Sequence, residues 1–269
     1  MSFLAFDFMR RALLAAVLVG AAAPAIGTFL VQRRLALMGD GIGHIALTGV
    51  ALGFLLGTAP VLTAIVVSIA GAVTIELIRE RGQTTGDVAL ALLFYGGIAG
   101  GVLLIGLSPG GSSATLVSYL FGSLSSVRAG DLVVIVGLCV AVIGVVVVFG
   151  RELFAVCSDE EVARVSGLPV RFLNILVAVT AAVTVTVAMR VVGLLLVSAL
   201  MVVPVAAVQQ LTTSFRATQL GACVTGVVAS VGGLVVAFYA DVAPGASTVV
   251  LALGGFLVAA LVGQLRPSR

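Results

Sequence analysis

Asp40 and His44 are the residues of this sequence whose types and spacing best suit metal chemistry. They lie four positions apart in LMGDGIGHIALTGVALGFLLG, residues 37–57, and His44 is the only histidine in the chain. Residues at positions i and i+4 share one face of an α-helix, so the carboxylate and the imidazole would point in the same direction. Carboxylate oxygen with imidazole nitrogen is a ligand set that suits zinc, manganese or ferrous iron. The spacing therefore predicts a site for a divalent metal ion.

The segment around this pair is otherwise apolar, which makes both side chains costly to bury. Counted from Arg34 as the last interfacial residue, Asp40 lies about 9 Å and His44 about 15 Å into a bilayer at about 1.5 Å per residue. Ionisable side chains at such a depth usually face a cavity and have a function. The opposite flank carries small residues that let another helix approach closely: Gly39, Gly41, Gly43, Ala46 and Gly49.

Two readings of the pair stay open at this point. In one, Asp40 and His44 satisfy each other, or bond backbone carbonyls, as a packing device. In the other they are ligands, although two ligands alone bind an ion weakly. A twofold dimer would bring two pairs together and supply two oxygen and two nitrogen ligands, and we expect this arrangement for an ion in transit.

The elements that must position the pair are membrane-spanning helices. Of the 269 residues, 61% are hydrophobic and 9% are charged, and the mean hydropathy is +1.31. Soluble domains carry roughly a quarter of charged residues, so this composition indicates a polytopic integral membrane protein. Its long unbroken apolar runs predict an all-α fold, because the strands of a membrane β-barrel would alternate in polarity. We expect residues 1–269 to form a single transmembrane domain.

Nine apolar runs are close to the length that a helix needs to cross the hydrocarbon, about 20 residues. They are 10–30, 37–56, 59–78, 88–107, 131–149, 171–190, 191–210, 217–239 and 247–264. Pro204 interrupts one run, so eight spans are the alternative. The stretch PGGSSATLVSYLFGSLSS, residues 109–126, is too polar to span and predicts a re-entrant or interfacial helix. The first run lacks a small-residue cleavage pattern, so we expect it to remain as a span.

The arginines indicate which side of the membrane each connection faces. Short cytoplasmic loops carry the excess of positive charge. If the loop with Arg33 and Arg34 is cytoplasmic and every run crosses, ten arginines lie inside and four lie outside. This favours an N-terminus outside and a C-terminus inside. Arg10 and Arg11 count against this orientation, because they would lie outside.

The longest polar connection, RELFAVCSDEEVARVSGLPVR at residues 151–171, contains a short helix signal. Ser158 followed by acidic residues is typical of a capped helix start, and Gly167 with Pro169 stops the helix. We expect an amphipathic helix of about nine residues. It is either a solvated connector or a docking element for a soluble partner.

Other polar or unusual residues are weaker candidates. Met201 beside Pro204 could line a constriction of a pathway, although a thioether in an apolar run is more often a packing residue. Asp241 in YADVAPGAS falls in an outer loop, where a turn or capping role competes with a gate. Glu76 is expected to pair with Arg79 three residues on.

The sequence does not predict an enzyme. The chain has no lysine and no phosphate-binding loop of the G-x-x-x-x-G-K-[ST] kind, so energy for transport must come from another polypeptide. No nucleophile and base constellation is evident.

Several stretches together resemble one family. They are QRRLALMGDGIGHIALTGVALG (32–53), SYLFGSLSSVRAGDL (118–132), SDEEVARVSGLPV (158–170), AMRVVGLLLVSALMVVPVAA (188–207) and FYADVAPGASTVVL (238–251). The chain resembles the permease subunit of bacterial ABC importers for divalent metals, a type II importer fold in the cell membrane. The G-D-x-x-x-H core is the most specific of the matching motifs.

The resemblance implies a homodimer in membrane lipid, with a nucleotide-binding ATPase on each protomer and an extracytoplasmic metal-binding receptor. Zinc or manganese would be the cargo, with no permanently bound cofactor, ATP on the partner subunit and no nucleic acid. Asp40 and His44 match the family's acidic and histidine residues on the path. Segment 158–168 matches the cytoplasmic helix that couples to the ATPase, which gives coupling roles to the following residues: Ser158, Asp159, Glu160, Glu161, Ala163 and Gly167.

Two departures from the family are evident, and two alternative functions stay open. Cys157 and Ser158 stand where relatives often have Phe-Asp before the coupling helix, and the further histidines of several relatives are missing. One alternative function is a secondary or channel-like metal carrier that acts without an ATPase. Another is an ABC permease for chelated iron or cobalamin, for which a midplane ligand pair would be unnecessary.

Overall fold

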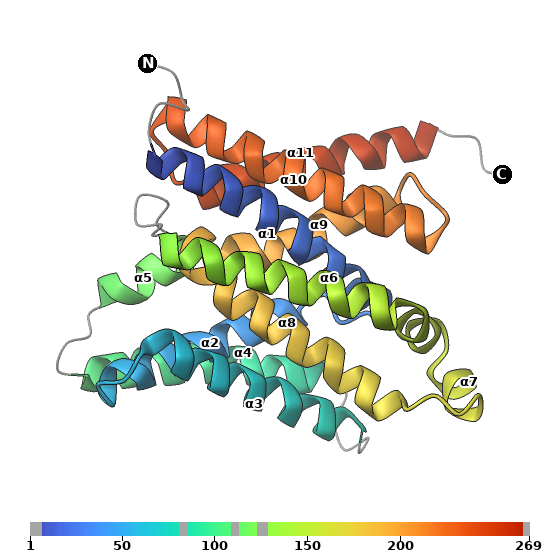
Figure 1. The fold of residues 1–269 in the computed structure, drawn as a ribbon, viewed down its shortest axis with the longest axis horizontal. Helices are drawn as coiled ribbons and strands as arrows, with labels where there is room; N and C mark the ends of the chain where they lie inside the picture. Colours follow the sequence, from blue (N-terminus) through green and yellow to red (C-terminus); the bar gives the residue numbers. More distant parts are fainter. Residues whose placement is uncertain (1–6, 81–85, 109–112, 123–128, 266–269) are drawn as a thin grey trace.

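The computed structural model describes residues 7–80, 86–108, 113–122 and 129–265 (Figure 1). Over these ranges the chain is helical and contains no strand, which confirms the all-α prediction. The helices are α1 (Asp7–Gln32), α2 (Met38–Leu55), α3 (Pro60–Glu80), α4 (Gly86–Leu107), α5 (Ser113–Phe121), α6 (Ala129–Ser158), α7 (Glu160–Val165), α8 (Val170–Val192), α9 (Leu194–Gln209), α10 (Phe215–Ala240) and α11 (Pro244–Leu265).

Eight of the helices in the described ranges are long and apolar enough to cross a membrane: α1, α2, α3, α4, α6, α8, α10 and α11. The ninth candidate, α9, has 16 residues and is therefore about 24 Å long. Its start lies beside the start of α11, where Leu196 is next to Gly245, and its end lies beside Gly263 through Gln210. Thus α9 runs alongside α11 for most of its length, and within the described ranges it is a shorter apolar helix beside the eight long ones.

The helix break in this region falls at Gly193 and leaves Pro204 inside α9. Gly193 has φ +88° and separates α8 from α9. A Cβ there would lie 2.5 Å from the carbonyl carbon of Phe121 in α5, so both the dihedral and the close approach favour glycine. The short helix α5 packs at this end of the bundle, as expected for a segment that does not cross.

Two groups of helices make up the bundle (Figure 1). Helix α1 lies in the middle and packs against α6, α8, α9 and α10. Gly27 lets α1 approach the backbone of α9 at Met201. Helix α2 packs between α3 and α4, and this second group joins the first through α8. The helix that carries Asp40 and His44 is therefore held by neighbours on several sides.

An ion pair joins helices at each end of the bundle. At one end, α7 meets the end of α1, the end of α3 and the start of α8, and Arg171 of α8 pairs with Glu80 of α3 at 3.2 Å. At the other end, Arg190 of α8 pairs with Asp131 of α6 at 2.9 Å. We call the end with α7 the α7 end. It is the end that the arginine distribution predicts to be cytoplasmic.

Candidate functional site

The imidazole of His44 is held by the backbone of its own helix. His44 is 7% exposed, and its Nδ1 lies 2.8 Å from the carbonyl oxygen of Asp40 and 3.8 Å from the Asp40 carboxylate. A carbonyl oxygen only accepts, so Nδ1 must donate, and the neutral ring then carries its lone pair on Nε2. Metal-binding histidines are commonly oriented in this way, with one nitrogen donating to a carbonyl and the other free for the ion.

Close packing of α2 against α4 positions this ring. The hydroxyl of Thr48 donates to the carbonyl of Gly97 at 2.7 Å. A Cβ at Gly97 would lie 2.5 Å from the carbonyl carbon of His44, so only glycine permits this approach. The Phe94 ring then lies against the imidazole, with centroids 4.4 Å apart. Small residues on both helices thus set the position of the His44 side chain.

A cavity of about 380 Å³ opens beside Asp40 between α2 and α4. Its walls are Leu37, Asp40, Leu90, Ala91, Phe94 and Tyr95. The Asp40 side chain is 27% exposed, whereas His44 is separate from the lining and contacts the cavity residue Phe94. In the part of the chain that the structure describes, no group of three or more His, Cys, Asp or Glu residues is placed to hold a metal. One protomer therefore supplies a carboxylate at a cavity and an imidazole just behind it.

The aromatic residues of this site were missed by the sequence analysis. Phe94 and Tyr95 sit in the apolar run 88–107, where two adjacent aromatic residues are unremarkable as membrane-span composition. Their relevance comes from the parallel course of α2 and α4, which a single sequence does not reveal.

Met201 and Pro204 lie in the packed interior of the protomer. Met201 is 1% exposed, and its sulfur packs near Gly39, the residue before Asp40. Pro204 is buried within α9. Met201 therefore packs against the helix that carries the pair, and a gating role for Met201 or Pro204 stays a prediction.

Asp241 ends helix α10. It adopts a left-handed conformation with φ 54° and ψ 43°, and its backbone N–H bonds the carbonyl of Ala237. Aspartate tolerates this conformation better than most residues. Asp241 thus ends the helix in a turn, while its gate role stays a prediction.

A short helix lies where the coupling helix is predicted, but the predicted start and length were wrong. Ser158 is the last residue of α6, and the N-cap of α7 is Asp159, whose carboxylate accepts from the backbone N–H of Val162 at 2.9 Å. Helix α7 has six residues rather than about nine. The backbone at Asp159 is extended, with φ −156°, as is usual for an N-cap, whereas Ser158 still belongs to α6.

The other end of α7 agrees with the prediction. Gly167 has φ +82°. The N–H of Leu168 bonds the carbonyl of Ala163, and the N–H of Gly167 bonds that of Arg164, which is the Schellman pattern. Ala163 is 2% exposed and anchors α7, whereas Glu161 is exposed. Helix α7 thus projects from the bundle with one face packed and one face open (Figure 1).

Charged side chains tie α7 to three other helices. Arg79 bonds Glu76 through two contacts of 2.6 and 3.2 Å, as the sequence predicted. Arg33, at the end of α1, lies 3.6 Å from Glu76 and 3.9 Å from Glu160. Glu160 also lies 3.8 Å from Arg79 and accepts from Asn174 of α8 at 3.4 Å. We call Arg33, Glu76, Arg79 and Glu160 the charge cluster.

Comparison with known proteins shows which family the chain belongs to. A family model described as the ABC 3 transport family matches residues 5–263. The manganese transport system membrane protein MntC of Halalkalibacterium halodurans is 30% identical over 256 residues, which cover 95% of this chain and 87% of MntC. The chelated iron transport system membrane protein YfeD of Yersinia pestis is 30% identical over 263 residues, which cover 98% of this chain and 88% of YfeD.

A solved structure agrees with the sequence comparisons. PsaBC from Streptococcus pneumoniae, in complex with Fab, superposes with a TM-score of 0.84 at 32% identity, over 95% of this chain and 91% of the matched chain. The family match extends over nearly the whole sequence and the eight long apolar helices fit a membrane environment. The chain is therefore a multi-pass membrane protein of the ABC 3 transport family.

Proposed function

We propose that this chain is the permease subunit of an ATP-driven importer that carries a divalent metal ion, manganese or zinc, across the cell membrane. The observation that carries the proposal is the geometry of His44. Its Nδ1 donates to the Asp40 carbonyl at 2.8 Å, which leaves the lone pair of Nε2 for an ion, and the Asp40 carboxylate comes from the preceding turn of the same helix. The name of the relative MntC, a manganese transport protein, supports the choice of metal.

A second copy of the chain completes the site in this proposal. One protomer offers one oxygen and one nitrogen ligand, which is too few to hold an ion firmly. Two large side chains of α4 near the cavity are exposed in the single protomer: Leu92 is 66% and Tyr95 is 70% exposed. A twofold partner packed there would cover them and bring a second Asp40 and His44 to the same path.

ATP hydrolysis belongs to a separate nucleotide-binding subunit, so the permease itself is not an enzyme. Helix α7 is the proposed contact, because Glu161 faces outward while Ala163 is buried against the bundle. An extracytoplasmic receptor would deliver the ion at the opposite end. The charge cluster joins α7 to the ends of α1 and α3, so a movement of α7 would be transmitted to these two helices.

Reconstitution tests this function. The permease with its ATPase is placed in liposomes, and uptake of manganese and zinc is followed with and without ATP. We expect uptake that requires both ATP and the ATPase. Metal flux through the permease alone would make it a secondary carrier and would overturn the importer assignment.

Transport of chelated iron is the second candidate, and the likeness to YfeD favours it. A chelate shields the metal from protein ligands, so His44 would contribute little. The His44→Gln permease separates the two: loss of manganese uptake supports free-ion transport, and full activity with a chelate supports the second candidate.

A further inference from the structure

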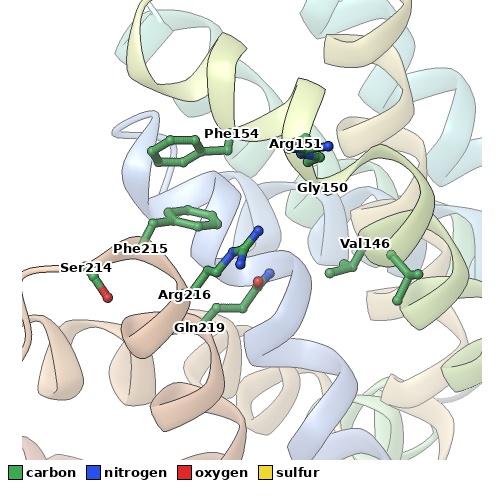
Figure 2. A pocket seen from close by; sticks show the side chains of 9 residues that line it. Val146, Gly150, Arg151, Phe154, Ser214, Phe215, Arg216 and Gln219 are labelled. Atoms are coloured by element: carbon green, nitrogen blue, oxygen red, sulfur yellow. The ribbon is translucent and has the colours of Figure 1, made fainter.

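A groove of about 660 Å³ lies between α6 and α10 near the α7 end of the bundle (Figure 2). Helix α1 packs against both α6 and α10 and forms the floor between them. The amide of Gln219 donates to the carbonyl of Ala25 in α1 at 3.2 Å, which fixes one wall to this floor.

Positive charge is concentrated in this groove. Arg151 comes from α6 and Arg216 from α10, and no acidic residue is among the described residues that line it. In Figure 2, the Arg216 side chain extends toward α6 while Arg151 stands on the opposite wall. Two guanidinium groups that face one groove favour an anionic ligand, and guanidinium suits phosphate in particular.

The two arginines lie at the depth of lipid headgroups. Twenty residues of helix span the hydrocarbon, about 30 Å. Counted from Asp131 at the opposite end of α6, twenty residues lead to Arg151. Arg216 lies in the first turn of α10, and that helix is 26 residues long, so its first turn also projects beyond the hydrocarbon.

Exposed apolar side chains, which we call the apolar tracks, continue from the groove along the outer surfaces of α6 and α10 toward the middle of each helix. On α6, Val140, Ile143 and Val147 are 67%, 52% and 75% exposed. On α10, three more residues four positions apart are 63% to 70% exposed: Leu220, Val224 and Val228. These spacings place each set on one face of its helix. The end of the groove is closed by the rings of Phe154 and Phe215, with centroids 4.8 Å apart.

We propose that this groove binds an anionic phospholipid, with the headgroup phosphate between Arg151 and Arg216 and the acyl chains on the two apolar tracks. Basic pockets between membrane helices recognise such headgroups. A second copy of the chain is a poorer occupant, because a twofold contact here would bring its own Arg151 and Arg216 to the same groove. A soluble anion would use the arginines and leave the tracks without a role.

Lipid retention tests the proposal. The permease with its ATPase is assembled in nanodiscs of equimolar phosphatidylglycerol and phosphatidylcholine, extracted into detergent, and its bound lipid is measured by mass spectrometry. The test variants are R151Q, R216Q and the double variant. The matched control is R171Q, which removes an arginine at the same end that pairs with Glu80 at 3.2 Å.

The wild type and R171Q should retain phosphatidylglycerol in preference to phosphatidylcholine. Each single groove variant should bind phosphatidylglycerol about fivefold more weakly than the wild type, and the double variant about 25-fold more weakly. One basic residue near a membrane surface contributes about 1 kcal/mol, which corresponds to about a fivefold change in affinity. Equal retention by the wild type and the double variant would refute the site.

Two further outcomes would overturn the lipid assignment. Inorganic phosphate is added to the detergent sample as a competitor, and full displacement of phosphatidylglycerol by phosphate alone would assign the groove to a soluble anion. Dissociation of the ATPase from the double variant in pure phosphatidylcholine nanodiscs would instead make the groove a protein contact.

Discussion

Arg33 at the end of α1 stands between the carboxylates of Glu76 and Glu160 without a hydrogen bond to either. Its Nη2 lies 3.6 Å from Glu76 and 3.9 Å from Glu160, beyond the usual N–H···O range of about 2.7–3.2 Å. The Arg33 side chain is only 6% exposed, and burial, together with the charge of Arg79, lowers its pKa. A small shift of α7 can therefore strengthen one contact and weaken the other.

Loss of the Glu160 charge should uncouple the ATPase from transport. In E160Q the link from α7 to Arg33 loses its ionic character, so α7 can move without pulling on the end of α1, which leads into α2. We expect ATP hydrolysis to continue while metal uptake falls severalfold. Parallel assays of phosphate release and manganese uptake in proteoliposomes measure this ratio.

The control for this prediction is E80Q. Glu80 pairs with Arg171 at 3.2 Å and joins α3 to α8 at the same end, but both side chains are well exposed. Exposed pairs contribute about 0–1 kcal/mol, so this variant should keep its ratio of uptake to hydrolysis. An equal change in E80Q and E160Q would contradict a specific role for the charge cluster.

Helix α7 should depend on Asp159 and be insensitive to Ser158. The D159A variant removes the acceptor for the Val162 N–H, and loss of such a cap costs about 1 kcal/mol of helix stability. We expect faster hydrogen exchange of the α7 amides in D159A and little change in S158A. Faster exchange in both variants alike would indicate that α7 is held by packing of Ala163 rather than by its cap.

The fold was largely predictable because membrane-spanning helices can be recognised from their apolar composition and their length. The number of crossings depended on 191–210, and there the sequence was ambiguous, since Pro204 is the visible helix breaker. The actual break is at Gly193, whose close approach to α5 is a tertiary contact. The predicted runs 171–190 and 191–210 place the boundary within a few residues of Gly193, but local patterns carry no information on the contact that requires a glycine there.

The candidate site was predictable where its residues share one helix. Asp40, His44 and the Glu76 pair with Arg79 follow from spacing along a single helix. The packing of Phe94 on His44, and the proximity of Arg33 to Glu160, join segments 50 or more positions apart in the chain. Helical periodicity fixes which residues share a face, but it does not say which helices meet.

Substitution of either proposed ligand should strongly lower metal uptake with little loss of stability. H44Q keeps a polar side chain but loses the imidazole nitrogen, and D40N keeps the shape but loses the charge. Loss of groups that support a metal site typically costs about 10- to 100-fold, so we expect at least a tenfold fall in manganese uptake.

Thermal unfolding of the same variants separates the two roles of the pair. If Asp40 and His44 only satisfied each other in packing, the variants would lower the unfolding temperature and keep metal uptake in proportion to the folded protein. A fall in uptake at an unchanged unfolding temperature supports ligation.

The contact between α2 and α4 should be the most sensitive point around the site, and the adjacent glycines Gly96 and Gly97 test it. In G97A the new Cβ would lie 2.5 Å from the carbonyl carbon of His44, whereas a Cβ at Gly96 has no atom within 4 Å. Overpacking of this kind typically costs about 1–3 kcal/mol, and separation of the helices would move Phe94 away from the imidazole. G97A should therefore lower both the unfolding temperature and manganese uptake. G96A should be neutral or slightly stabilising, because alanine favours a helix over glycine by about 0.5–1 kcal/mol. Normal uptake by G97A would show that the α2–α4 contact does not position His44 for transport.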